Sequence, residues 1–576
     1  MTTPLLERTF APTLAAVIAE FSAQPGVRLD AWVFDDLAAR RAAEAALARA
    51  GVVARIRSAF KPLVHFFLEE AEPGFVRAEI AYPQHPAAPA NRFLLEAYPL
   101  AGLLKGAEVT FAAGSDDPLT YAVTLAYADG ATRAHRVFAP NREHADAVAM
   151  PQLSPTGWLR ATDADGVRRD GPLSTEVEQM FAAAVAAAAE WPERAPDALP
   201  EQLRLAATLP WPDQPLGLGD EAVRLAEALH EDLYFSLLEV FQTRSGLALG
   251  DRTLQPGQIA PCVTVAEGPP KVRVSSRPLD AAEATGPKVA MADPQEPPPP
   301  AQIAAELAKV GGAAFAVAAV SGHPVWARHR EGGDAAVMIS GGQHANEPSG
   351  IVGALRAAQA LAKRPEAHFT VHPLENPDGY ALYRELIALS PGQMLHGARY
   401  TALGDDLEYR RSEPRFESAI RDEAIRRARP NFHINLHGYP AHEWCRPFTG
   451  YIPRGFAQWM LPRGFFFIVR HHSAWSGAAE RMIAAVTRRV AAALPEVLAL
   501  TERQRAISAP HAGENGFRIV NGFCCTITAD DTLATPLKLT TEYPDESLRG
   551  PAYALACAAQ AETVLAAYDA YQKIVG

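Results

Sequence analysis

The sequence has little cysteine and no long apolar run. Its cysteines are few, odd in number and without a C-x-x-C pair: Cys262, Cys445, Cys524, Cys525 and Cys557. This usage is typical of a reducing compartment rather than of a disulfide framework. The longest apolar run, residues 181–189, has nine residues, or ten with Met180 before it, whereas a membrane-spanning helix needs roughly 20. No basic leader precedes the first apolar stretch, so we expect a cytoplasmic protein with no membrane as partner.

The sequence also lacks an excess of positive charge. Lys and Arg number 54 against 66 Asp and Glu, and the formal net charge is −12. A protein of this charge is poorly suited to bind nucleic acid or an anionic membrane surface. The hydrophobic share of 48% and the charged share of 21% are those of a globular protein.

The length predicts more than one domain, because 576 residues exceed the size at which a single core stops growing. Segment 283–302 is rich in proline, which disfavours helix and central strand and favours an extended connection. We therefore predict an N-terminal domain at 1–282, a linker at 283–302 and a second domain at 303–576. The first 282 residues show no repeat, no charge block and no cluster of residues at metal spacing. An accessory α+β domain that packs against the second half, or narrows access to it, is our expectation.

The second half alternates strand and helix patterns, which predicts an α/β sheet. An apolar run at 335–340 has the length of a strand, and the spacing of apolar residues after it predicts a helix from about residue 351. The turn-forming sequence at 376–379 is expected to end a strand. The other predicted elements are strands at 368–374, 431–436 and 537–541, a long helix at 475–498 and a closing helix at 551–574.

Fewer elements can be predicted in the first half. Its opening section, 13–50, is rich in alanine and is expected to be helical. Strands are expected at 108–111 and 120–127. Thr175 and Glu178 have the spacing of a capping box, which predicts a helix that begins there.

A histidine and a carboxylate stand three residues apart where a predicted strand gives way to a helix. They are His344 and Glu347, and open α/β sheets build their sites at such strand ends. His437 ends a later strand, where its apolar neighbour Leu436 would point into the core. Two histidines and one glutamate form an open three-ligand zinc set that leaves a position for water. A His-x-x-Glu alone is also compatible with a helix N-terminus that carries a solvated glutamate.

Several short segments around these residues occur in a distinctive order. They read VSGHPV at 320–325, HANE at 344–347, NPDGY at 376–380, NLHG at 435–438 and TEYP at 541–544. In this order they resemble the zinc metallocarboxypeptidase family, over about residues 302–576. The resemblance implies a mixed, mostly parallel sheet flanked by helices and a bound Zn²⁺ with His344, Glu347 and His437 as ligands. It does not reach the N-terminal half, which we expect to be a separate domain.

The resemblance also implies catalytic roles for two residues. Glu542 matches the family's general base, and a carboxylate beside the metal is suited to take a proton from water and give it to the leaving amine. Asp545 or Glu546 is the alternative base. Arg399 is the candidate for supporting the oxyanion.

The specificity residues depart from the family. Glu408 and Tyr409 stand where the family has an Asn-Arg pair that binds the terminal carboxylate of the substrate. A glutamate there would repel a free carboxylate unless a neighbouring arginine replaces the missing cation. We expect Arg410 to line the pocket as a substrate-binding residue and Arg411 to be a solvated loop residue. His433, on the same strand face as His437, is expected to be a supporting or core histidine.

Three functions fit this pattern. The first is zinc-dependent hydrolysis of a peptide or related amide bond, with Glu542 as general base. The second is a zinc-dependent deacylase of N-acyl amino acids or modified peptides, which the altered carboxylate pocket favours. The third is a non-catalytic binding protein with a degenerate site, against which Glu542 beside a complete ligand set counts. The substrate partner is thus a peptide or an acylated amino acid, and the sequence leaves its identity and the oligomeric state open.

Overall fold

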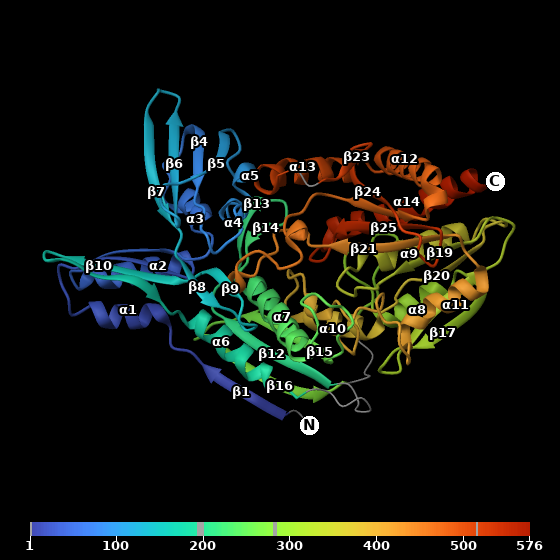
Figure 1. Cartoon of the computed structure of the whole chain (residues 1–576), viewed down its shortest axis with the longest axis horizontal. Helices are drawn as coiled ribbons and strands as arrows, with labels where there is room; N and C mark the ends of the chain where they lie inside the picture. Colours follow the sequence, from blue (N-terminus) through green and yellow to red (C-terminus); the bar gives the residue numbers. More distant parts are fainter. Residues whose placement is uncertain (1–2, 193–200, 280–284, 514–515) are drawn as a thin grey trace.

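The protein is described by a computed structural model that covers residues 3–192, 201–279, 285–513 and 516–576. The N-terminal half, blue to green in Figure 1, lies beside the C-terminal half, which is yellow to red. Across these ranges, no helix combines the length and the apolar character that crossing a membrane requires.

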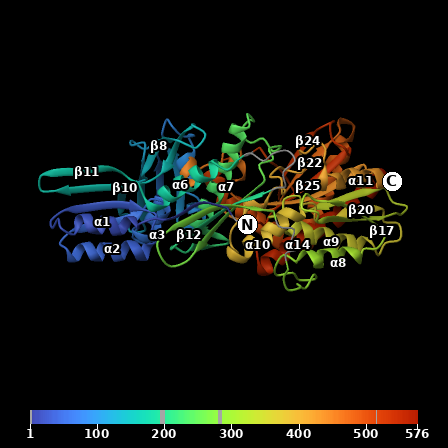
Figure 2. The same cartoon turned by 90° about the horizontal axis from the view of Figure 1, so that it is seen from below.

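A nine-stranded mixed sheet forms the centre of the C-terminal half (Figures 1 and 2). In chain order its strands are β17 (Ala313–Ala318), β18 (Pro324–Arg330), β19 (Val337–Gly341), β20 (Phe369–His372), β21 (Phe432–Tyr439), β22 (Phe466–His471), β23 (Arg518–Val520), β24 (Phe523–Ala529) and β25 (Leu537–Pro544). Their spatial order is β17-β18-β20-β19-β21-β25-β22-β24-β23. The central strands β20, β19, β21 and β25 run parallel, whereas β22 is antiparallel to β25. The predicted mixed α/β sheet flanked by helices is confirmed.

Helices cover both faces of this sheet. They are α8 (Pro300–Ala308), α9 (Ser349–Leu361), α10 (Pro377–Leu389), α11 (Ala419–Ala428), α12 (Ser476–Ala493), α13 (Pro495–Ala512) and α14 (Gly550–Val575). The predicted helix at 475–498 is wrong in one respect, because Pro495 starts a new helix and the two pieces are α12 and α13. The segment expected as a turn at 376–379 opens α10 instead. The Asn376 side chain accepts a hydrogen bond from Gly379 N at 2.8 Å and caps that helix.

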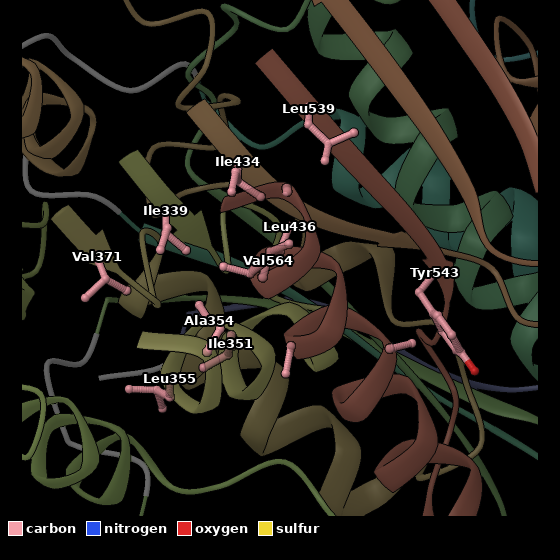
Figure 3. Close-up of a cluster of buried hydrophobic side chains, with 14 of the residues drawn as sticks. Ile339, Ile351, Ala354, Leu355, Val371, Ile434, Leu436, Leu539, Tyr543 and Val564 are labelled. Atoms are coloured by element: carbon pink, nitrogen blue, oxygen red, sulfur yellow. The ribbon is translucent and has the colours of Figure 1, made fainter. Parts of the chain in front are cut away.

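The two faces of the central strands differ in chemistry. Figure 3 shows apolar side chains of the strands packed against α9 and α14. On β21 these are Ile434 and Leu436, and on β25 Leu539. Because neighbouring residues of a strand point to opposite faces, the alternate positions of the same strands face the other way. That second face carries polar side chains and borders a cavity.

The N-terminal half is built from smaller sheets with helices beside them. The strands are β1 (Thr3–Thr9), β2 (Arg28–Val33), β3 (Val53–Ser58), β4 (Phe75–Tyr82), β5 (Glu108–Ala113), β6 (Thr120–Tyr127), β7 (Thr132–Phe138), β8 (Asn141–Ala145), β9 (Pro151–Pro155), β10 (Gly157–Asp163), β11 (Gly166–Leu173), β12 (Glu201–Leu209), β13 (Gln214–Leu218), β14 (Glu221–Val223), β15 (Gln258–Val265) and β16 (Lys271–Pro278). They form four-stranded sheets in the orders β1-β16-β12-β15, β11-β10-β2-β3 and β5-β4-β6-β7, and the pairs β8-β9 and β13-β14.

The helices of this half are α1 (Thr13–Phe21), α2 (Leu37–Arg49), α3 (Pro62–Glu69), α4 (Arg92–Glu96), α5 (Leu100–Leu103), α6 (Glu176–Ala189) and α7 (Leu225–Arg244). The predicted strands β5 and β6 are confirmed, as is the capping box of Thr175 and Glu178 at the start of α6. The expected helical section at 13–50 is interrupted, since β2 lies between α1 and α2.

Helix α7 joins the two halves of the chain through buried charges. Of its 20 residues, 17 are buried, which is unusual for a helix with four carboxylates. Each carboxylate has a partner in the C-terminal half. Glu227 binds His442, Glu231 binds His396, and Asp232 and Glu239 both bind Arg446. Through these pairs α7 contacts the loops of the C-terminal half that carry His396, His442 and Arg446.

Replacing Arg446 by Met is expected to destabilise the protein by about 3–5 kcal/mol, because one partner of a buried ion-pair network is removed. Asp232 and Glu239 would lose their shared guanidinium, of which Nη1 lies 2.8 Å from Glu239. Thermal unfolding measures the effect. The matched control is Arg426→Met on α11, whose exposed side chain pairs with Glu423 and should contribute under ~1 kcal/mol. Equal melting temperatures of the two variants would contradict the role of this network.

The proline-rich segment runs along α10. Tyr380 donates to the carbonyl of Pro298 and Arg384 donates to that of Pro297, each at 2.6 Å. Residues 285–288 are exposed and belong to no strand or helix. Residues 280–284 lie outside the described ranges. The division into 1–282, 283–302 and 303–576 stays a prediction.

Trypsin is expected to cut first after Lys288, because extended, exposed backbone is the preferred site of proteolysis. The two fragments should co-elute in gel filtration, since the buried ion pairs of α7 hold them together. A first cut elsewhere would contradict the proposed border, and fragments that separate would contradict the joining role of α7.

Candidate metal centre and active-site cavity

The three predicted metal ligands lie together at one edge of the large sheet. His344 and Glu347 are in the turn between β19 and α9, and His437 is near the end of β21. Because β19 and β21 are parallel neighbours, their ends reach the same edge. Gly342 has a φ of +64°, a left-handed conformation that glycine adopts readily, and the turn it forms leads to His344. One possible ligand atom from each of the three residues lies within 4.8 Å of the others.

The ligand atoms converge on one point. The two carboxylate oxygens of Glu347 lie 2.7 Å from Nδ1 of His344 and 2.9 Å from Nδ1 of His437. The other ring nitrogens face outward. Nε2 of His344 lies 3.3 Å from Asp406, and Nε2 of His437 lies 2.8 Å from the side-chain amide of Asn435 and 3.1 Å from Oε1 of Gln343. An imidazole that donates from Nε2 keeps the Nδ1 lone pair free for a cation. The donor set therefore fits Zn²⁺.

The electrostatics of the group favour the forms that bind metals. Burial alone would raise the pKa of Glu347, but His344, Arg399 and His437 hold that pKa well below its ordinary value. Burial lowers the pKa of His437, although the charge of Glu347 opposes this. A metal ligand must be a carboxylate or a neutral imidazole, and the two shifts favour those two forms.

Glu542 lies beside this group on the next strand. In the register of β21 and β25 it is directly opposite His437, and it lines the cavity. Burial, and then the charge of Glu347, raise the pKa of Glu542 well above its ordinary value. The alternative bases are placed differently. Asp545 accepts a hydrogen bond from Ser349 N at 2.8 Å, and Glu546 lies 3.5 Å from His396; neither is among the lining residues.

The structure separates the predicted arginines. Arg399 lines the cavity, and its Nη1 lies 2.7 Å from Glu347. Arg410 is buried and is not among the lining residues, because its guanidinium is bound by Asp405 and Glu417. We therefore assign no substrate contact to Arg410. Arg411, expected as a plain loop residue, is exposed and lines the cavity in its place.

The three residues His344, Glu347 and His437 are called the metal group below. The cavity has a volume of about 790 Å³ and extends from the metal group along the polar face of the sheet. Its wall includes Phe235 and Arg252 from the N-terminal half. Several cations of the lining were not predicted from the sequence, and they include residues of the large sheet and its helices. Arg421 comes from α11 and Lys538 from β25. The signal for Lys538 was present, because it precedes Glu542 by four residues on one strand and so faces the same way.

The remaining histidines of the region have other partners. Nε2 of His433 lies 2.7 Å from Oγ of Ser340, and the ring borders the cavity below the metal group. His471 and His472 contact the backbone carbonyls of His472 and Leu533 at 2.9 and 3.0 Å. The described structure thus keeps these two out of the metal group.

Comparisons with known proteins give only distant likenesses. No family model and no curated protein matches the chain. Among solved structures, the chain resembles a putative metallopeptidase from Shewanella denitrificans at 15% identity, over 46% of this chain and 89% of that one, with a TM-score of 0.29. It also resembles a metallo-carboxypeptidase from Burkholderia cenocepacia at 16% identity (54% and 77% covered, TM-score 0.29). The carboxypeptidase A from Helicoverpa armigera is similar at 12% identity (54% and 90%, TM-score 0.31).

Proposed function

We propose that residues 303–576 act as a zinc-dependent hydrolase that cleaves a peptide or related amide bond. The observation that carries this proposal is the convergence of His344, Glu347 and His437 beside a large cavity. Glu542, on the neighbouring strand, faces the same cavity. A metal group with an adjacent carboxylate is the arrangement that metal-assisted hydrolysis needs.

Different residues of the chain have different roles in the proposed reaction. Zn²⁺, when bound, acts as a Lewis acid and lowers the pKa of water toward neutrality. Glu542 accepts the proton of the attacking water and delivers it to the leaving amine. Arg399, whose guanidinium already lies at the metal group, donates hydrogen bonds to the oxygen on which negative charge develops. Asp406 orients His344, and Asn435 and Gln343 orient His437, through the Nε2 atoms of the two histidines.

A deacylase that acts on N-acyl amino acids or modified peptides is the second candidate. The observation in its favour is the environment of Glu408, which lines the cavity and is bound by Arg421 and Lys538. These partners hold the pKa of Glu408 well below its ordinary value despite burial. The family resemblance implies an Asn-Arg pair at this place, with an amide and a guanidinium that bind a carboxylate. A permanent negative charge differs from both groups.

A panel of substrates separates the candidates. It contains peptides with free C-termini, the same peptides with amidated C-termini, and N-acyl amino acids, each tested on zinc-loaded protein with and without a chelator. We expect cleavage that the chelator abolishes and that zinc restores. Preference for peptides supports the first candidate, and preference for N-acyl amino acids the second. A zinc-loaded protein that binds members of the panel and cleaves none would be a binding protein.

A further inference from the structure

The cavity is far more cationic than the protein. The chain has a net charge of −12, yet the lining of the cavity contains seven basic side chains and four carboxylates. The basic residues are Arg252, Arg399, Arg411, Arg415, Arg421, Arg470 and Lys538; the carboxylates are Glu408, Asp422, Asp530 and Glu542. A cleft lined by one sign of charge raises the local concentration of ligands of the opposite sign.

The excess is concentrated where the cavity follows the sheet away from the metal group. There Lys538 of β25 stands directly opposite Arg470 of β22, in an antiparallel register. Both side chains line the cavity. Directly opposite residues of an antiparallel pair have Cβ atoms about 4.5–5.5 Å apart, and like charges in this position destabilise a sheet. An anion between them would remove that cost.

The carboxylates of the protein do not supply this anion in full. Glu375 binds Arg421 through two hydrogen bonds of 2.6 and 2.7 Å. Glu408 is shared, because it binds Arg421 and also lies 2.8 Å from Nζ of Lys538. The three cations at this end, Arg421, Lys538 and Arg470, therefore face Glu375 and Glu408, and Asp530 is a third carboxylate nearby.

Arg470 is the cation left over. It makes no ion pair within the described ranges, and its side chain is exposed. Its electrostatic neighbour Asp530 is half-buried, and that carboxyl group also accepts a hydrogen bond from Thr532 at 2.6 Å. Of the three cations, Arg470 is thus the one without an ion-pair partner among the described residues, which leaves its guanidinium available to an anionic ligand.

We propose that this end of the cavity binds the side-chain carboxylate of an acidic residue, with Lys538 and Arg470 as its cationic partners. The proposal deepens the hydrolase function and rests on it: the acidic residue is the C-terminal one, on the amine side of the scissile amide. Lys538 and Glu542 are four residues apart on β25, which corresponds to ~13 Å along a strand. A glutamyl side chain of the substrate and the lysine side chain together bridge this distance.

Three blocked dipeptides that differ only in the C-terminal residue, Glu, Gln or Lys, test the selectivity. The neutral Gln has nearly the shape of Glu and lacks the charge. We expect kcat/KM for the Glu substrate to exceed that for Gln by roughly 10- to 100-fold, the range of a hydrogen bond to a charged group. The Lys substrate should be the poorest. Equal rates for Glu and Gln would overturn the proposal.

Three variants assign the effect to residues. Lys538→Met and the exposed Arg470→Gln should each lower the Glu-over-Gln ratio. Glu408→Gln should raise it, because it removes a competing carboxylate, and a merely structural defect would not strengthen selectivity. Arg426→Gln, a matched loss of an arginine outside the cavity on α11, should leave the ratio unchanged. A ratio that is insensitive to both Lys538→Met and Arg470→Gln would also overturn the proposal.

A binding experiment separates this proposal from the hydrolase function. Calorimetric titration of the purified full chain with L-glutamate and with L-glutamine needs no turnover. Tighter binding of glutamate that Arg470→Gln weakens supports the acidic pocket even if every dipeptide resists cleavage, in which case only the hydrolase function fails. Equal affinity for the two amino acids, or binding of neither, would overturn the acidic pocket whatever the protein hydrolyses.

Discussion

Glu542→Gln is expected to lower the kcat of amide hydrolysis by at least ~10²-fold, the lower range for removal of a general base. The amide keeps the shape of the side chain and cannot accept the proton of the attacking water. Glu542 faces the cavity opposite His437, so its loss removes the carboxylate nearest in register to the metal ligands. Steady-state kinetics on the preferred substrate of the panel measures the effect.

The fold and the metal content of this variant should stay those of the wild type. Circular dichroism and metal analysis serve as the controls, because Glu542 is not one of the three metal ligands. Near-normal turnover would contradict the assignment and move the role to Asp545 or Glu546. The structure argues against that outcome, since Asp545 is engaged at the start of α9 and neither residue lines the cavity.

His344→Ala and His437→Ala are each expected to remove the metal and, with it, all measurable hydrolysis. Only two ligands would remain in either variant, whereas an open zinc site uses three protein ligands. Loss of Lewis-acid activation removes the main source of the rate enhancement proposed above. Metal analysis of the purified variants gives the result independently of any substrate.

His433→Gln is the matched control for these two variants. His433 lies on the same strand as His437 and on the same face, but it contacts Ser340 rather than Glu347. We expect this variant to retain the metal. Metal content like that of the wild type in His344→Ala or His437→Ala would contradict the assigned ligands, and loss of metal in His433→Gln would show that the group extends further along β21.

Much of the C-terminal sheet could be predicted because its strands have simple patterns. The apolar run before Gly341 and the alternation around Ile434 each indicate a strand directly. The ends of the helices were harder to predict from the sequence. Pro495 begins α13 after a break of one residue, and the Asn376-Pro377 step reads equally well as a turn or as a cap followed by a first-turn proline.

The parts of the cavity that depend on loops and distant contacts could not be predicted. Arg410 and Arg411 are adjacent in a loop without periodicity, so which of them faces the cavity depends on backbone geometry. Helix α7 has the acidic residues of a surface helix, and its burial depends on partners such as His442 and Arg446, more than 200 positions away. Arg252 reaches the cavity by the same long-range packing. By contrast, His344 and Glu347 share one turn, and that local spacing together with the family resemblance was enough to predict them.

Anomalous diffraction at the zinc edge, from crystals of the zinc-loaded protein, tests the central claim most directly. The account predicts one strong peak between Nδ1 of His344, Nδ1 of His437 and the carboxylate of Glu347, within bonding distance of all three. Crystals of His437→Ala grown in the same way should lack it. A peak at another site, or no peak in protein that contains stoichiometric zinc, would contradict a catalytic metal centre built from these residues.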